Sequence, residues 1–356
     1  MLFTVHCKRG EIVELGERKK EILGIVVNNF INNGEPVGSK SVAESLSKEL
    51  SSATIRNEMM ALEEMGYLYQ PHTSAGRIPS VIGYREYVER IMQFHKLTNK
   101  EKRSIDSFLS NINSDFSSLA KLFANKASEI SGCAAVTVTP VSGGVVKMFE
   151  AVVAGKRLMV IIAISANGSV RTKLCVTQND ASSDSASILS RILNTVLSGI
   201  DPHDIGEVKT EILQDQVSKF CPDLKSVLST VASLIEELKG YEAFVGGEAL
   251  ILTYPGFSDA EKAKVFINFL NKQDELAKVA RENPNGGICV DVFSEKTNKE
   301  IRDISLISSG FNMGNIKGYM CVYGPTRIDY AKVLAKINYF TKSVSKLLSN
   351  TYFDDK

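Results

Sequence analysis

Apolar residues recur every three or four positions through the first part of the chain, which predicts helices in succession. The expected helices span 18–33, 39–48 and 52–65. One apolar stripe runs along the third helix and consists of Ile55, Met59 and Leu62. Ser51 or Ser52 can begin this helix by accepting a hydrogen bond from an otherwise unpaired backbone N–H. The pattern therefore predicts a well-delimited amphipathic helix with a polar outer face.

Beyond the third helix the pattern changes to a short strand, a tight polar loop and a further helix. Tyr67–Tyr69 has the β-propensity of a strand, and prolines and a glycine bracket the loop from Pro71 to Pro79. A helix is expected over 80–97. Three helices followed by a strand and a loop are the order of a winged helix-turn-helix, in which the third helix enters the major groove of DNA.

Charge supports this interpretation only locally. The chain has a net charge of +1, and its first hundred residues hold 13 Lys or Arg against 12 Asp or Glu, which is again +1. No acidic residue, however, lies between Glu64 and Glu86, whereas Arg77 and Arg85 both do. This stretch can lie against phosphate without like-charge repulsion. Nucleic-acid binding therefore depends on the distribution of charge around the loop and not on its total.

The expected DNA contacts follow from this arrangement. Thr54, Arg56 and Asn57 lie off the apolar stripe near the start of the third helix, where side chains reach base edges. Serine hydroxyls at the helix starts can reach phosphate. In the loop, a glycine permits a tight turn and an arginine can reach the backbone or the minor groove. The predicted DNA-binding residues are Ser39, Lys40, Ser51, Ser52, Thr54, Arg56, Asn57, His72, Thr73, Ser74, Gly76 and Arg77.

The remainder of the chain is expected to alternate between helices and strands. A long helical stretch at 100–131 precedes strands at 134–139, 145–153, 158–165 and 169–177. Helices are then expected at 183–197, 202–220 and 223–239. Further strands are expected at 243–245, 288–293, 304–308 and 317–323, with helices at 258–281 and 329–349. The first strand and the last four can form one sheet if the elements between them are an insertion.

Candidate catalytic chemistry is not found in the sequence. The six cysteines are scattered without a C-x-x-C pair, and the four histidines occur in no nucleophile or metal-ligand pattern. We therefore expect no enzyme, no cofactor and no metal, and no membrane span because no apolar run approaches ~20 residues. The Gly324–Arg327 turn is expected to start the last helix. Arg327 is expected in a structural ion pair, with a ligand or partner contact as the alternative.

Several motifs resemble those of the heat-inducible transcription repressor HrcA family. They are GSK at 38–40, SSATIRNEM at 51–59, PHTSAGRIPS at 71–80, GYREYV at 83–88 and GPTRIDY at 324–330. The loop motif followed by GYR is the most specific. The last motif extends the similarity over nearly the whole chain.

The resemblance implies an α+β multidomain protein with a winged helix-turn-helix, a GAF-like α/β domain and an inserted α+β dimerisation domain. The implied limits are 1–97 for the DNA-binding domain, of which 1–16 is an extension, 98–144 with 241–356 for the GAF-like domain, and 145–240 for the insertion.

The resemblance also implies a function. Such a protein would be a homodimeric repressor of the bacterial cytoplasm, associated with the nucleoid. It would bind the CIRCE inverted-repeat operator in double-stranded DNA, upstream of chaperone operons of the dnaK and groE type, and its activity would depend on the GroEL chaperonin. The alternative function is a small-molecule-responsive winged-helix regulator whose GAF-like domain senses a ligand.

Overall fold

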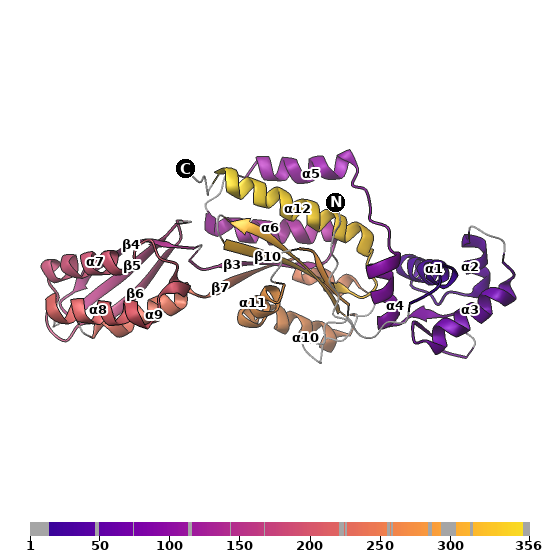
Figure 1. The fold of residues 1–356 in the computed structure, drawn as a ribbon, viewed down its shortest axis with the longest axis horizontal. Helices are drawn as coiled ribbons and strands as arrows, with labels where there is room; N and C mark the ends of the chain where they lie inside the picture. Colours follow the sequence, from indigo (N-terminus) through magenta and orange to yellow (C-terminus); the bar gives the residue numbers. More distant parts are fainter. Residues whose placement is uncertain are drawn as a thin grey trace.

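The computed structural model describes residues 14–46, 50–73, 75–112, 116–142, 144–166, 168–220, 224, 226–254, 257, 259–283, 287–292, 304–313 and 316–351. Figure 1 shows an elongated molecule with three parts in line. A helical N-terminal part lies at one end, a sheet covered by helices occupies the centre, and a smaller sheet with its own helices lies at the other end.

The N-terminal part is a winged helix. Its elements are α1 (Glu17–Asn33), α2 (Ser39–Ser45), α3 (Ser52–Glu64), β1 (Leu68–Tyr69), β2 (Ile78–Pro79), α4 (Val81–Glu86) and the π-helical turn η1 (Tyr87–Ile91). The helices pack through fully buried side chains such as Ile22, Val26 and Ile55. The two short strands pair antiparallel and form the base of the wing. This order of elements confirms the prediction from the sequence.

The helix predicted over 80–97 is shorter than expected. It ends in η1, and the backbone becomes extended at Met92. The chain then continues without helix to Thr98, which caps the next helix. Phe94 and Leu97 of this segment line a cavity against the central part. Their apolar character therefore reflects contact with the central part and not a helical stripe.

The central part has helices on both faces of one antiparallel sheet. In the described residues the strand order is β7 (Tyr241–Gly246), β3 (Ala134–Pro140), β10 (Ile316–Pro325), β9 (Ile304–Met313) and β8 (Cys289–Asp291). One face carries α5 (Asn99–Ser110), α6 (Phe116–Ser131) and α12 (Tyr330–Thr351). The other carries η4 (Glu248–Thr253), α10 (Ala260–Leu270) and α11 (Gln273–Arg281). Each of the two long helical segments expected here therefore consists of two helices.

Alternate residues of the central strands face two separate cores. In β10, Met320 and Val322 belong to the core beneath α6 and α12, whereas Cys321 and Tyr323 belong to the core beneath α10 and α11. The sheet joins the strand before the predicted insertion with the four after it, which confirms the pairing expected from the sequence.

The last helix begins within one residue of its predicted start at 329, but the Gly324–Arg327 turn does not begin it as expected. Gly324 and Pro325 are the last residues of β10 and pair with β9, and α12 begins at Tyr330. Proline lacks an N–H donor and is compatible with the last position of a strand, where the ladder of hydrogen bonds ends.

The third part lies between β3 and β7 in the sequence. Its sheet has the order β4 (Val146–Gly155), β5 (Leu158–Ser165), β6 (Val170–Val176), and its helices are α7 (Ser183–Leu197), α8 (Glu207–Phe220) and α9 (Val227–Leu238). The helix expected over 202–220 is divided into a short 3-10 turn, Pro202–Asp204, and α8. α7 packs on β4 and α9 on β6, whereas α8 packs against α7, and side chains of all three helices share a core with the sheet. The domain limits given above remain predictions.

Candidate nucleic-acid interface

α3 is fixed at its start by a side-chain cap and along its length by its apolar stripe. The Oγ of Ser51 accepts a hydrogen bond from the backbone N–H of Thr54 over 3.1 Å. Ile55 is fully buried, as the stripe predicts. Arg56 and Asn57 are consequently exposed on the opposite face, and Thr54 is half-buried beside them. The sequence-predicted base-reading residues therefore share one accessible surface.

The start of α2 provides a second group of predicted contacts. Ser39 is the first residue of this helix and is half-buried, whereas Lys40 is exposed. Ser52, the first residue of α3, is also exposed. These positions present hydroxyls, a cation and unpaired backbone N–H groups, which suit phosphate.

The loop of the wing is shaped by a residue that the sequence did not single out. The side-chain amide of Gln70 donates to the carbonyl oxygens of Thr73 and Ala75 over 3.0 and 2.8 Å. His72 and Thr73 are exposed on this loop. Ser74, also a predicted contact, lies outside the described residues. The glutamine thus holds the two ends of the loop together and leaves the polar tip accessible.

Arg77 has a structural partner within the winged helix. Its Nε and Nη2 lie 2.8 and 2.7 Å from the Oε2 of Glu63 on α3, and its side chain is only 15% exposed. Its backbone N–H and C=O each bond to Val37, both over 2.9 Å. Arg77 therefore ties the wing to α3 and to the turn before α2. The sequence suggested a phosphate contact, but the guanidinium is already engaged.

Gly76 is required for a different reason from the one expected. It is not among the glycines with positive φ, so the turn itself does not demand it. A Cβ at this position would lie 2.5 Å from the backbone carbon and oxygen of Val37. Glycine is needed here because the wing and the turn before α2 approach backbone to backbone.

The acidic residues of α3 are partly neutralised by neighbours. The Nζ of Lys19 on α1 lies 2.6 Å from the Oε2 of Glu58, and this hydrogen bond is the main cause that lowers the pKa of Glu58. Glu63 is paired with Arg77 in the same way. The remaining charge near the exposed start of the helix is that of Arg56, which favours a polyanionic ligand.

A second candidate surface is the face of the small sheet opposite its helices. In the strand register, Val160 of β5 lies between Val152 of β4 and Leu174 of β6. Met148, Val152, Leu174 and Val176 are exposed, Leu174 to 62%. We call these four residues, together with Val160, the open face. Contiguous apolar surface of this kind marks an interaction site on a folded protein.

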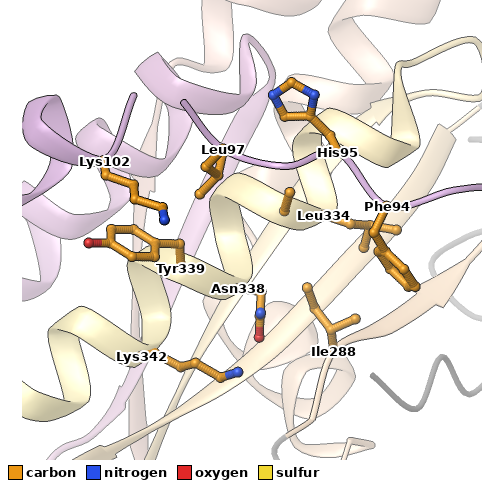
Figure 2. A pocket seen from close by; sticks show the side chains of 10 residues that line it. Phe94, His95, Leu97, Lys102, Ile288, Leu334, Asn338, Tyr339 and Lys342 are labelled. Carbon is orange, nitrogen blue, oxygen red and sulfur yellow. The ribbon is translucent and has the colours of Figure 1, made fainter. Parts of the chain in front are cut away.

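The segment that leaves the winged helix crosses the central part at a small cavity of about 220 Å³ (Figure 2). Phe94 and Leu97 of this segment line it together with Leu334 of α12. Lys102 lies over the ring of Tyr339 with its Nζ 6.0 Å from the ring centroid. The cavity thus lies where the segment after the winged helix packs on the central part.

Among the described residues, no cluster of three or more His, Cys, Asp or Glu side chains could hold a metal ion. None of the helices described is long and apolar enough to cross a membrane.

Comparisons with known proteins identify two matching family models. One, described as HrcA protein C terminal domain, matches residues 118–334. The other, described as winged helix-turn-helix transcription repressor, HrcA DNA-binding, matches residues 14–89.

Similar proteins cover nearly the full length. The chain is 34% identical to the heat-inducible transcription repressor HrcA of Acetivibrio thermocellus, over 93% of this chain and 96% of that protein. The corresponding protein of Carboxydothermus hydrogenoformans is 32% identical, over 95% of this chain and 100% of its own length. A crystal structure of a hypothetical protein at 2.2 Å resolution shares the fold, with a TM-score of 0.58 and 22% identity over 95% of this chain and 100% of its own.

Proposed function

The chain belongs to the heat-inducible transcription repressor HrcA family, and on this basis we propose that it represses transcription by binding an inverted-repeat operator as a homodimer. The observation that carries the proposal is the exposed polar face of α3 beside the wing, with Arg56 and Asn57 at its accessible start. A single helix fits the major groove, and its first turns meet base edges.

The predicted contacts divide into two proposed roles. Arg56 and Asn57 read bases because both side chains can make bidentate contacts, with Thr54 beside them. Ser39, Lys40, Ser51, Ser52, His72 and Thr73 are exposed or half-buried around that face and hold the DNA backbone. We assign Ser74 to this second group because it directly follows Thr73 in the sequence. For Gly76 and Arg77, the contacts to Val37 and Glu63 favour a role in fixing the wing on α3.

Self-association is proposed through the open face of the small sheet. One winged helix reads only a few base pairs, so a repressor with useful specificity needs two copies at a fixed spacing. Two antiparallel sheets pack readily when each has an apolar face, and the open face is apolar across all three strands of this sheet. Packing against a second copy would remove Leu174 and its neighbours from water.

Dependence on the GroEL chaperonin, and release of the operator on heating, are proposed from the family resemblance. Heat release requires a DNA-binding domain of modest stability, since a few kcal/mol change the folded fraction greatly. Glu86 in α4 supports this. Its side chain is 0% exposed, and neither carboxylate oxygen has a hydrogen-bond partner among the described residues.

A gel-shift titration tests the proposal. The full-length protein is titrated with a duplex carrying the CIRCE inverted repeat from upstream of a chaperone operon, and with the same duplex after one half-site is scrambled. We expect a complex of two chains per intact duplex and much weaker binding to the scrambled one. Added GroEL should raise the active fraction. Equal affinity for both duplexes would contradict an operator-specific repressor.

A further inference from the structure

A large cavity lies between the winged helix and the central sheet. Its volume is about 620 Å³, within the range of natural small-molecule sites, roughly 300 to 1,000 Å³. One wall comes from the end of α1, the base of the wing and the start of α4, and the other from η4, the residue Phe257 and the turn after β10. Aromatic rings make up much of the lining, from Phe30, Tyr69, Tyr84, Tyr254 and Phe257.

Arg327 brings a positive charge to this cavity. Its guanidinium packs against Gly34, so closely that a Cβ there would overlap it. Gly34 ends α1 in a left-handed conformation, and the negative end of the helix dipole favours a cation at that place. Arg327 forms no hydrogen bond and no ion pair with any residue that the structure describes. The structural ion pair expected from the sequence is therefore not found there, and the guanidinium donors remain available.

Tyr84 adds a second unused donor. The residue is 2% exposed, and its hydroxyl has no hydrogen-bond partner within the described parts of the chain. Burial raises the pKa of the Tyr84 hydroxyl well above its usual range, with Arg327 close enough to oppose the shift, so the group stays protonated and can donate. A buried polar group without a partner is rare and calls for a ligand or another explanation.

The rest of the lining carries no opposing charge. None of the described residues around the cavity is acidic. The Arg327 guanidinium thus lines a space whose other walls are mainly rings and apolar side chains, and the Tyr84 hydroxyl is enclosed within one of those walls. Carboxylate and phosphate groups accept hydrogen bonds from a guanidinium with good geometry, and flat rings pack well on aromatic walls.

We propose that this cavity binds a planar aromatic anion, a ring that carries one carboxylate or phosphate group, with Arg327 as its donor and the enclosed Tyr84 hydroxyl as a second donor that the bound ligand uncovers. Because the walls belong to two domains, a bound ligand would fix the winged helix relative to the central sheet. Binding of the ligand does not depend on the DNA-binding proposal, whereas its effect on operator affinity rests on it.

Calorimetric titration of the full-length protein tests the ligand. The probes are benzoate, indole-3-carboxylate and phenyl phosphate, and benzamide and indole-3-carboxamide are their neutral counterparts. We expect saturable binding of at least one anion, about tenfold or more tighter than the matching amide. The carboxylate and phosphate arms identify which anionic group the site prefers. Absence of saturable binding by every anion, or equal binding of the neutral amides, would overturn the proposal.

Two variants test whether Tyr84 and Arg327 bind the anion. Tyr84→Phe removes a hydroxyl that has no partner, so the melting temperature without ligand should stay unchanged or rise, while the affinity for the anion falls about fivefold. Arg327→Met should abolish the preference for the anion over the amide. Arg281→Met is the matched control, since Arg281 lies over the ring of Tyr241, 4.5 Å from its centroid, outside this cavity. Unchanged anion binding in both test variants would refute the site.

An operator titration with and without the bound probe then measures coupling. A protein that binds the anion but no operator retains the ligand site and refutes the proposed repressor function. A protein that binds operator but no anion refutes only the ligand site.

Discussion

Sequence selectivity should depend on Arg56 and Asn57, which α3 exposes next to each other. Replacing either with alanine should weaken operator binding by about 1 to 3 kcal/mol, because a bidentate contact to a base edge is worth that much. Anisotropy titrations against the operator and its single-base variants measure both affinity and selectivity. Lys121→Ala, which removes an exposed cation from α6, is the control and should change neither. Wild-type selectivity in both α3 variants would show that this helix does not read the bases.

The pair formed by Arg77 and Glu63 should stabilise the winged helix. Its charged atoms lie 2.7 Å apart and both side chains are largely shielded, at 15% and 30% exposure. A double-mutant cycle with Arg77→Ala and Glu63→Ala, followed by urea unfolding, should give a coupling free energy of about 1 kcal/mol.

The same Arg77 variant separates a structural from a phosphate-binding role. Loss of a phosphate contact flattens the salt dependence of DNA binding by roughly one unit. Because Glu63 occupies the guanidinium, we expect a smaller change in slope for Arg77→Ala. A change of a full unit would mean that Arg77 leaves Glu63 and binds DNA.

Glu86 should make the stability of the winged helix depend on pH. Burial is the main cause that raises the pKa of Glu86, and Arg90, with its Nη1 3.5 Å away, opposes the shift only in part. A carboxyl whose pKa is higher in the folded than in the unfolded state destabilises the fold once it ionises. The free energy of unfolding should therefore fall as the pH rises from the ordinary value of 4.5 through the raised folded value.

Glu86→Met should remove this pH-dependent loss of stability. At pH 7 the variant should gain about 1 kcal/mol or more in the free energy of unfolding, because an apolar side chain of similar size replaces a buried charge. Urea unfolding at pH 5 and pH 8 measures the gain and its pH dependence, with Glu44→Met on the exposed side of α2 as the control. Repression should then persist to a higher temperature. A less stable variant would mean that the buried carboxylate supports the fold.

At the scale of elements, the wing owes its position to the backbone contact at Gly76. Gly76→Ala should destabilise the protein by about 1 to 3 kcal/mol, since the added Cβ meets the Val37 backbone at 2.5 Å and one of the two elements must shift. Gly38→Ala is the matched comparison, because nothing lies within 4 Å of a Cβ there. It should cost less, about 0.5 kcal/mol as an N-cap change. Denaturation midpoints of the two variants measure the difference in stability. Equal losses of stability would show that the backbone contact at Gly76 does not position the wing.

Elements defined by local signals were predictable from the sequence. α3 lies within one residue of its predicted limits, because its apolar stripe and serine cap are properties of neighbouring residues. The link from Arg77 to Glu63 was not predictable, since it joins two elements across the wing. The same holds for Gly76, because the backbone that requires a glycine there belongs to Val37, a residue distant in the sequence. Helical spacing also overestimated the helix at 80–97, where apolar residues serve a contact between domains.

At the scale of the whole molecule, self-association should depend on the open face. Leu174→Asp should shift the protein toward monomer with little loss of monomer stability, because Leu174 is 62% exposed in the single chain. Val208→Asp is the matched control, since this α8 residue is 69% exposed away from the small sheet's strands. Sedimentation equilibrium measures the dissociation constant of both variants. An unchanged dimer in Leu174→Asp would place the interface elsewhere.

The inserted part leaves the central sheet and returns to it on neighbouring strands. Pro140 of β3 is opposite Tyr241 of β7, and the N–H of Val141 donates to the carbonyl of Gly240 over 3.0 Å. In topological terms the whole unit is the enlarged tip of a β-hairpin. Insertions, deletions or replacements in such a tip leave the strand order of the central sheet unchanged. The part proposed to self-associate and the winged helix can therefore change in sequence independently of each other during evolution.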